Sequence, residues 1–594
     1  MVSYKQIIIL FLMKKIKQLS LLLLVTTFFA SCTDIDDNLN NNSSNSFTEN
    51  FGNQVSRDFM GEIVDENNNP IQNVTITIGT SAVQTDENGI FIIKNAFVYE
   101  KLAYIKANKV GFINGSRTLV PTTGMNQVKI MMIASIPVAI VQSGQNSEVT
   151  LPNQTKINFD GAFEDESGNL YSGDVSVFAY HLETSNEDLT DLMPGMLYAE
   201  ALDGSAKVLE TFGMLHVELK GNSGQKLQIA AEHTAQIAMK IDVTQTTSAA
   251  NTIPLWHFDE VNGYWKEEGE ASKQGDYYVG NVSHFSWWNC DQFLTRTFLN
   301  LTIKDSNNNP LSYTNVSIQR ANTSVSFSQF TDVNGFTRGY VPANENLNAV
   351  LIDACENIIY LPIGTLSANS INNVDLIYTP NGSANLVTVE GNLKDCNSVN
   401  VTNGYVVLEY GNYHKRYVPT DANGDFTINS MYCLPDVNYT LTAFDFSSLQ
   451  TTGQINYIYP LNTRVVNIGN LMTCNSVSEF ISYQIDNDAT IYHLGNIDVG
   501  YSPNGLSIST FNNPVQNGIL IWCNSNTLGN QITFGIEGSD VGLIDQSSTS
   551  ITFTLNSFGN VGDFIDVSFY GSYQSIIDNQ THTITGIAHV IRDN

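Results

Sequence analysis

The chain has 594 residues, a length that predicts about three to six domains, each large enough to bury a core. Hydrophobic residues make up 42% and charged residues only 14%, so uncharged polar side chains supply most of the polar surface, as in all-β extracellular modules. The 58 acidic and 27 basic residues give a net charge of −31, which repels a phosphate backbone and excludes nucleic-acid binding.

Residues 1–31 have the pattern of a signal peptide. Four lysines and no acid precede the apolar run from Leu21 to Ala30, which is too short to be read as a membrane span. Either Met1 or Met13 could be the first residue of the protein, because Met13 is followed within four residues by three of these lysines and makes as good a signal start as Met1.

The end of this segment, Phe29-Ala30-Ser31-Cys32, resembles the lipobox of bacterial lipoproteins, in which a cysteine is acylated and becomes the new N-terminus. The resemblance implies a fatty-acid (palmitate) anchor on Cys32 and a location on the outer membrane. Acyl chains hold a soluble domain to a bilayer without a transmembrane helix. The alternative is an ordinary signal peptide with a chance cysteine.

Residues 32–56 are predicted to be a disordered tether, because they begin with a long polar stretch that cannot bury enough apolar surface to order itself. The acidic residues directly after Cys32 resemble the export signal of surface-exposed lipoproteins in some Gram-negative bacteria. A simple solvated spacer is the alternative, so the choice between the periplasmic and the outer face stays open.

Three later segments share one pattern, which we call the first repeat (57–133), the second repeat (293–380) and the third repeat (381–475). Each contains an alternating strand, such as Thr75 to Ile78, followed by a Thr-Asp-x-Asn-Gly turn and a phenylalanine. Alternation marks half-buried strands, and Asn-Gly supplies the positive φ of a tight turn. The pattern predicts a small antiparallel β-sandwich in each repeat.

The repeats resemble the carboxypeptidase regulatory-like domain, which implies a transthyretin-like β-sandwich and specifies no function. Their Asp- and Asn-rich turns, such as Asp65 to Asn69, carry many oxygen atoms. They lack the ligand spacing and the bidentate acid of an EF-hand, so turn chemistry is the favoured interpretation over calcium binding.

Between the first and second repeats lies a β-rich segment (134–292), which we call the tryptophan module. It locally resembles a module that accompanies regulatory-like domains in extracellular matrix proteins such as cartilage intermediate layer protein. Exposed aromatic rings on β-surfaces stack on sugars and anchor proteins. Alternation puts Trp287 and Trp288 on opposite faces, so one ring is expected outside unless another domain covers that face, although core packing is expected for most. The candidate ligand surface comprises Trp256, Trp265, Trp287 and Trp288.

His257 and Glu260 match the H-x-x-E zinc pair of metallocarboxypeptidases. In a strand these two side chains point to opposite faces, and the next histidine, His284, is too near in sequence for the third ligand of that family. The adjacent acids Glu267 and Glu268 diverge in the same way. No other catalytic motif is present, so we expect no catalytic residue, no metal ligand and no cofactor.

With Cys32 acylated, six cysteines remain, which allow 15 disulfide connectivities. Three of them lie in or at the edge of the third repeat, so at least one bridge inside it is expected, with free buried thiols as the alternative. The connectivity stays open among Cys290, Cys355, Cys396, Cys433, Cys474 and Cys523.

The C-terminal module (476–594) alternates again, as in Ile551 to Leu555, and is predicted to be a final β-sandwich. The predicted fold class is therefore all-β, a string of antiparallel β-sandwich domains after a signal peptide and a disordered tether. The predicted function is that of a non-catalytic cell-surface lipoprotein, a binding, adhesion or structural module for a glycan or protein. The alternative is a hydrolase or accessory protein of extracellular glycan or peptide breakdown. Ligand identity and oligomeric state stay open.

Overall fold

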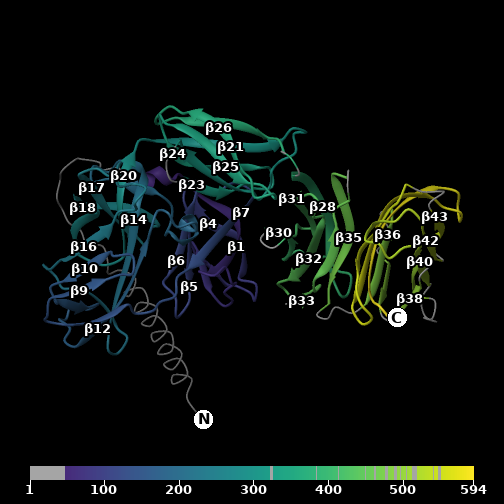
Figure 1. The fold of residues 1–594 in the computed structure, drawn as a ribbon, viewed down its shortest axis with the longest axis horizontal. Coiled ribbons are helices and arrows are strands. Elements are labelled where there is room, and N and C mark those ends of the chain that lie inside the picture. The colour runs from purple at the N-terminus through teal and green to yellow at the C-terminus, as the bar shows by residue number, and fades with distance from the viewer. Residues whose placement is uncertain are drawn as a thin grey trace, which may run out of the picture. The chain divides into compact units, whose positions relative to one another are not determined.

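The structure is a computed structural model, and the prediction of an all-β fold of β-sandwich sheets in series is confirmed (Figure 1). Helical elements among the described residues are η1 (Phe47–Phe51) and α2 (Leu189–Leu192). The predicted signal peptide, most of the tether and Cys32 lie outside the described residues. The structure describes residues 47–593 apart from 322–324, 381, 383, 412–413, 449, 461–462, 475–478, 487–490, 495–496, 503–504, 511–517, 539–540 and 546–549.

The first repeat forms a sandwich of a three-stranded sheet, β4-β1-β7, and a four-stranded sheet, β3-β2-β5-β6. Ile76 and Ile78 are buried between the two sheets while Thr75 and Thr77 point outward, as the alternation predicts. The strands are β1 (Gln54–Asp65), β2 (Thr75–Ile78), β3 (Ser81–Gln84), β4 (Ile90–Tyr99), β5 (Ala103–Asn108), β6 (Gly115–Leu119) and β7 (Met125–Met132).

The second repeat has the same topology, because its first strand pairs antiparallel with the fourth and parallel with the last. Its sheets are β24-β21-β27 and β23-β22-β25-β26. The strands are β21 (Arg296–Asp305), β22 (Asn315–Arg320), β23 (Val325–Phe330), β24 (Phe336–Pro342), β25 (Asn346–Ile352), β26 (Ile358–Thr365) and β27 (Ile371–Tyr378).

The third repeat follows this plan with one added strand, since β34 also pairs with β32. Its sheets are β31-β28-β35 and β30-β29-β32-β33. The strands are β28 (Ala384–Asp395), β29 (Gly404–Tyr410), β30 (His414–Pro419), β31 (Asp425–Cys433), β32 (Asn438–Asp445), β33 (Gln450–Thr451), β34 (Ile455–Ile458) and β35 (Val465–Thr473).

The acidic turns of the repeats are stabilised by hydrogen bonds within each turn. Asp65 Oδ1 accepts the backbone N–H groups of Asn67 and Asn69 at 2.8 and 2.9 Å, and Asp305 and Asp395 accept the corresponding groups in their own repeats. An aspartate that accepts a hydrogen bond from the backbone N–H two residues on stabilises the turn. These contacts are those of the turn chemistry that the sequence favours.

The tryptophan module is built on a 13-stranded sheet. One face packs on a core that includes Trp288, and the other on a core that includes Trp287. The strands are β8 (Ala139–Gln142), β9 (Ser147–Thr150), β10 (Lys156–Phe159), β11 (Phe163–Asp165), β12 (Asp174–Leu182), β13 (Tyr198–Glu200), β14 (Ala206–Gly221), β15 (Lys226–Ile229), β16 (Ala235–Lys240), β17 (Thr252–Asp259), β18 (Tyr264–Gln274), β19 (Tyr277–Val282) and β20 (Trp287–Leu294).

The C-terminal module pairs a six-stranded sheet, β37-β36-β46-β45-β44-β41, with a five-stranded sheet, β38-β39-β40-β42-β43. The strands are β36 (Phe480–Ile485), β37 (Ile491–Leu494), β38 (Asp498–Ser502), β39 (Gly505–Ser509), β40 (Ile519–Cys523), β41 (Gly529–Asn530), β42 (Phe534–Gly538), β43 (Gly542–Asp545), β44 (Thr552–Phe558), β45 (Phe564–Gln574) and β46 (Thr581–Ile591). The boundaries predicted between domains stay predictions.

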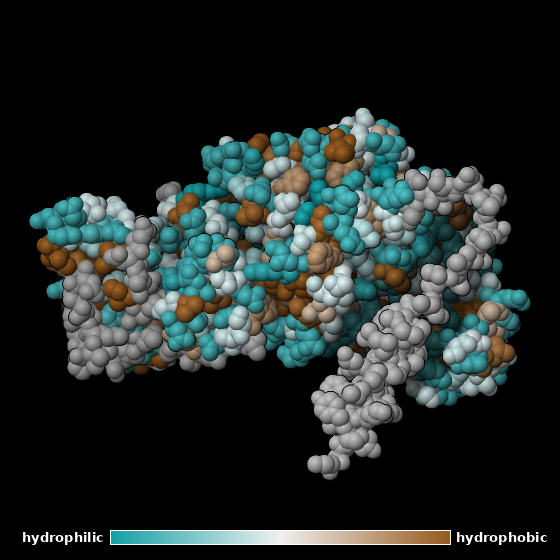
Figure 2. Space-filling model, turned by 180° about the vertical axis from the view of Figure 1, so that it is seen from behind, coloured by the Kyte–Doolittle hydropathy of each residue, from teal (hydrophilic) through white to brown (hydrophobic). Residues whose placement is uncertain are grey.

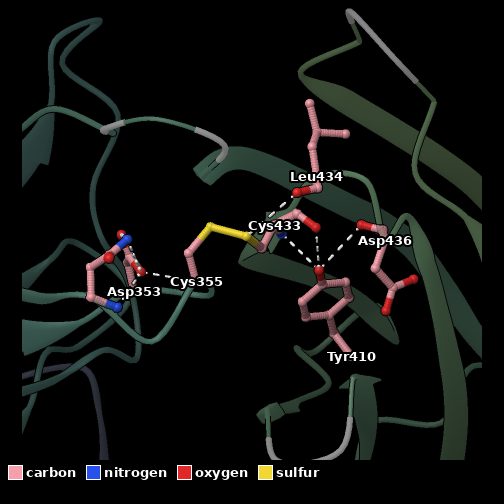
Figure 3. Close-up of a disulfide and its surroundings, with 7 residues drawn as sticks. Asp353, Cys355, Tyr410, Cys433, Leu434 and Asp436 are labelled. Carbon is pink, nitrogen blue, oxygen red and sulfur yellow. Dashed lines mark hydrogen bonds between the residues drawn. A yellow bond between two sulfur atoms is a disulfide. The ribbon is translucent and has the colours of Figure 1, made fainter.

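Two disulfides answer the open question of connectivity. Cys396 is bonded to Cys474 within the third repeat, and Cys355 of the second repeat is bonded to Cys433 of the third (Figure 3). Cys290 and Cys523 are free and buried, and burial raises the pKa of both thiols. The second and third repeats are thus joined covalently, which the sequence did not reveal.

On the face that Figure 2 displays, apolar residues are interspersed among hydrophilic ones. Within the described residues, no helix has the length and apolar character to cross a membrane.

Candidate functional site

A cleft of about 340 Å³ lies between the first repeat and the tryptophan module. Its volume falls within the range of small-molecule sites, about 300–1,000 Å³. The residues that line it combine hydroxyl and amide groups with aromatic rings: Thr75, Thr77, Tyr104, Lys106, Ala107, Asn108, Asn114, Gly115, Ser116, Pro194, Phe258, Glu260 and Trp287.

The first wall is the outer face of the sheet β3-β2-β5-β6. On β5, Ile105 points into the sandwich core, so its neighbours Tyr104 and Lys106 point outward. Thr75 and Thr77 on β2 face the same side because Ile76 and Ile78 are buried. Strand alternation therefore places polar groups in a row along this wall.

The second wall comes from the tryptophan module. Phe258 lies near the end of β17, Glu260 follows that strand, and Trp287 begins β20. The rings of Phe258 and Tyr104 meet edge to face across the two modules, with their centroids 6.0 Å apart. Aromatic side chains from both walls thus border the cleft.

Specific contacts hold the two walls together. Tyr104 Oη donates a hydrogen bond to the Glu260 carbonyl at 3.1 Å, and Thr118 Oγ1 donates to the Gly263 carbonyl at 2.7 Å. Beneath them, Ile113 and Met131 of the first repeat share a hydrophobic core with the tryptophan module. The two walls of the cleft are therefore joined by one continuous hydrophobic core.

The polar groups of the cleft suit an uncharged, hydroxyl-rich ligand. The Tyr104 hydroxyl is protonated at neutral pH, and burial raises its pKa further above the usual value for tyrosine. Asn108 Nδ2 donates to Asn114 Oδ1 at 2.6 Å, which leaves further donors and acceptors of both amides for a ligand. Lys106 and Glu260 supply one charge of each sign, and so the lining has no strong net charge.

The four tryptophans predicted as a ligand surface are all buried, with exposures of 0% for Trp256, Trp265 and Trp288 and 3% for Trp287. Alternation does put Trp287 and Trp288 on opposite faces of β20, in two different cores. Both faces are covered, the Trp287 face in part by the first repeat, which is the exception that the sequence analysis allowed. Of the four, Trp287 lines the cleft.

His257 and Glu260 lie apart. Glu260 lines the cleft with Trp287, whereas the His257 ring lies against Trp288, with centroids 5.8 Å apart, on the other face of the sheet. The structure instead brings His257 together with Glu268 and His284. Burial, followed by the neighbouring His284, lowers the pKa of His257.

Sequence reasoning missed the residues of the first wall. The alternation from Ala103 to Asn108 shows which side chains point outward. It carries no signal that another module covers this face, because the contacts join segments far apart in sequence, such as Tyr104 and Glu260, which are 156 residues apart.

Comparison with known proteins establishes no family. No family model and no curated protein matches the chain. Among solved structures, a streptococcal ancillary pilin is similar over 37% of this chain and 92% of its own, at 11% identity and a TM-score of 0.13. The major pilin subunit of Bacillus cereus is similar over 71% of this chain and 100% of its own, at 10% identity and a TM-score of 0.12. Two B repeat units of the collagen-binding protein of Staphylococcus aureus are similar over 71% of this chain and 100% of their own, at 12% identity and a TM-score of 0.12. These similarities are distant and carry no argument about function.

Proposed function

We propose that the protein is a non-catalytic cell-surface lipoprotein that binds an extracellular glycan, in an adhesion or structural role, through the cleft between the first repeat and the tryptophan module. The observation that carries the proposal is the lining of this cleft. Hydroxyl and amide groups stand along one wall, and the rings of Tyr104, Phe258 and Trp287 border it.

A glycan fits this lining better than a protein segment does. Sugar hydroxyls both donate and accept hydrogen bonds, and threonine hydroxyls and asparagine amides do the same. The apolar faces of sugar rings pack on exposed aromatic side chains. In this cleft the half-exposed Tyr104 supplies that surface, because Phe258 and Trp287 are only 2% and 3% exposed. A protein anchor would favour a deeper apolar pocket at the centre of a larger interface.

The location is proposed from the N-terminal sequence. The lipobox-like residues before Cys32 support an acyl anchor on the outer membrane, and the acidic residues after it support display on the cell surface. The test is partition into detergent in cells that acylate lipoproteins. Wild type should enter the detergent phase and Cys32→Ala should stay in the aqueous phase, and a Cys32→Ala protein that still enters detergent would refute the anchor.

Screening separates this function from the hydrolase alternative. The purified protein is incubated with polysaccharides and peptides, first to detect turnover and then to detect binding. The proposal expects an oligosaccharide to bind and to be recovered intact. Turnover of any of these substrates would instead support the hydrolase.

A further inference from the structure

Three side chains of the tryptophan module converge on its surface at some distance in sequence from one another. Glu268 Oε2 lies 3.3 Å from His284 Nε2 and 3.6 Å from His257 Nε2. All three ligand atoms lie within 4.8 Å of one another. Two imidazoles are therefore directed at a single carboxylate oxygen.

The sheet fixes this arrangement. His257 on β17 lies opposite Trp288 on β20, and the Trp288 indole N–H donates to the His284 carbonyl at 2.9 Å. The Trp288 ring lies beside both imidazoles, at centroid distances of 5.8 and 5.1 Å. The fully buried Trp288 ring thus packs beside both imidazoles.

Glu268 is set in place by a β-bulge in β18. Pro254 pairs with Glu270 and Trp256 pairs with Glu267, so Leu255 faces two residues, Glu268 and Gly269. Gly269 has a φ of +82°, which glycine adopts without strain. The Glu268 carboxylate also accepts a hydrogen bond from Ser283 Oγ at 2.8 Å, which orients it from outside the cluster.

Two of the three separations are close to those of ligands around one small ion, and the third is no more than 4.8 Å. Two ligand atoms bound to a tetrahedral zinc ion at about 2.0–2.1 Å lie roughly 3.3–3.4 Å apart. The two histidine-to-glutamate distances, 3.3 and 3.6 Å, are close to that value. The 3.6 Å contact is too long for a hydrogen bond, so a hydrogen-bonded pair accounts for only one of the two imidazoles.

We propose that His257, Glu268 and His284 form a binding site for a transition-metal dication of the zinc class. Two imidazole nitrogens and one carboxylate oxygen suit Zn²⁺ and its neighbours, whereas calcium and magnesium prefer oxygen ligands alone. The side chains are 21%, 41% and 34% exposed, respectively, so an ion reaches them from solvent and keeps a fourth position open. The site is separate from the glycan cleft and does not depend on the proposed function.

The test is metal binding by the full-length protein. After chelator treatment and dialysis, ZnCl₂ is titrated by calorimetry, and CoCl₂ is added to record the visible absorption of tetrahedral cobalt. We expect one saturable ion at this cluster and a tetrahedral Co²⁺ spectrum. His284→Ala and Glu268→Gln should each lower the affinity at least about tenfold, since each removes a ligand.

The matched control is His233→Ala, because His233 Nδ1 contacts Asp160 Oδ2 at 2.5 Å on the surface and, among the described residues, has no third ligand beside it. This variant should bind zinc like wild type. Glu268→Gln keeps the size of the side chain, and thermal melting of each variant verifies the fold. Absence of saturable binding, or binding that the two cluster variants leave unchanged, would overturn the proposal.

Discussion

Cys355 and Cys433 form a disulfide between two different repeats, with their Cα atoms 5.1 Å apart. Each cysteine is held by its own repeat (Figure 3). Asp353 Oδ1 accepts the Cys355 N–H at 2.8 Å, and the Tyr410 hydroxyl accepts the Cys433 N–H at 2.7 Å. Both cysteines are thus anchored within their own repeats, and the disulfide links the second repeat covalently to the third.

Replacing both cysteines of this bond, as Cys355→Ser with Cys433→Ser, should lower the free energy of unfolding by about 2–4 kcal/mol. It should also make the connection between the repeats sensitive to protease. The matched control removes Cys396 and Cys474, whose bond spans the same 78 residues within one repeat. Chemical denaturation and limited proteolysis measure the two effects. Equal cleavage between the repeats in both variants would contradict the role of the Cys355–Cys433 bond as the link between the second and third repeats.

Gly263→Ala should separate the walls of the cleft. An added Cβ would lie 2.4 Å from the Tyr104 ring, and the φ of +81° is strained for alanine. We expect a loss of about 2–4 kcal/mol, of which overpacking contributes about 1–3 kcal/mol. The control is Gly275→Ala, with a φ of +62° and no atom within 4 Å of the added Cβ, which should cost about 1–2 kcal/mol. The test compares the melting temperatures of the two variants with that of wild type. Equal losses of stability in both variants would refute the packing of Gly263 against Tyr104.

His216 should make the tryptophan module less stable in mild acid. Burial lowers the pKa of His216 to about 3, so its imidazole stays neutral in the folded state. In the unfolded chain, with a pKa near 6.5, it takes up a proton as the pH falls, and stability is lost progressively from about pH 6.5 toward pH 3.

The test is His216→Phe, which retains a ring beside Trp287. Between pH 7.5 and 5 the variant should lose about 2 kcal/mol less stability than wild type, as judged by denaturation at both pH values. The same loss in both proteins would mean that this imidazole is not buried neutral.

Tyr405→Phe should weaken the contact between the first and third repeats. Tyr405 Oη donates a hydrogen bond to Asp86 Oδ2 at 2.6 Å, and Asn88 Nδ2 donates to Tyr405 Oη at 3.1 Å. Loss of the hydroxyl leaves the half-buried carboxylate of Asp86 short of a donor, at a cost of about 1–3 kcal/mol. Tyr360→Phe, at a side chain on β26 with 56% exposure, is the control and should change the stability little. Denaturation curves that coincide for the two variants would contradict this contact.

Local features could be predicted from the sequence. The Asn262-Gly263 turn between β17 and β18, the burial of Ile76 and Ile78, and the opposite faces of Trp287 and Trp288 all follow from turn chemistry and the two-residue period of a strand.

Features that depend on distant segments could not be predicted. Part of the cover over Trp287 comes from the first repeat, and the approach of Glu268 to His284 depends on a bulge that shifts the register of β18. The partner of Cys355 lies in another repeat, where no spacing rule applies.

Calorimetric titration of the strongest oligosaccharide ligand from the screen tests the central claim most directly. The proteins compared are wild type, the cleft variants Lys106→Ala and Asn108→Ala, and Lys156→Ala, which removes the same charge from β10 outside the cleft. The proposed cleft predicts that both cleft variants bind at least about tenfold more weakly, as expected when about 1.4 kcal/mol of contacts is lost, while Lys156→Ala binds like wild type. Equal affinity in all four proteins would place the ligand elsewhere and contradict the account.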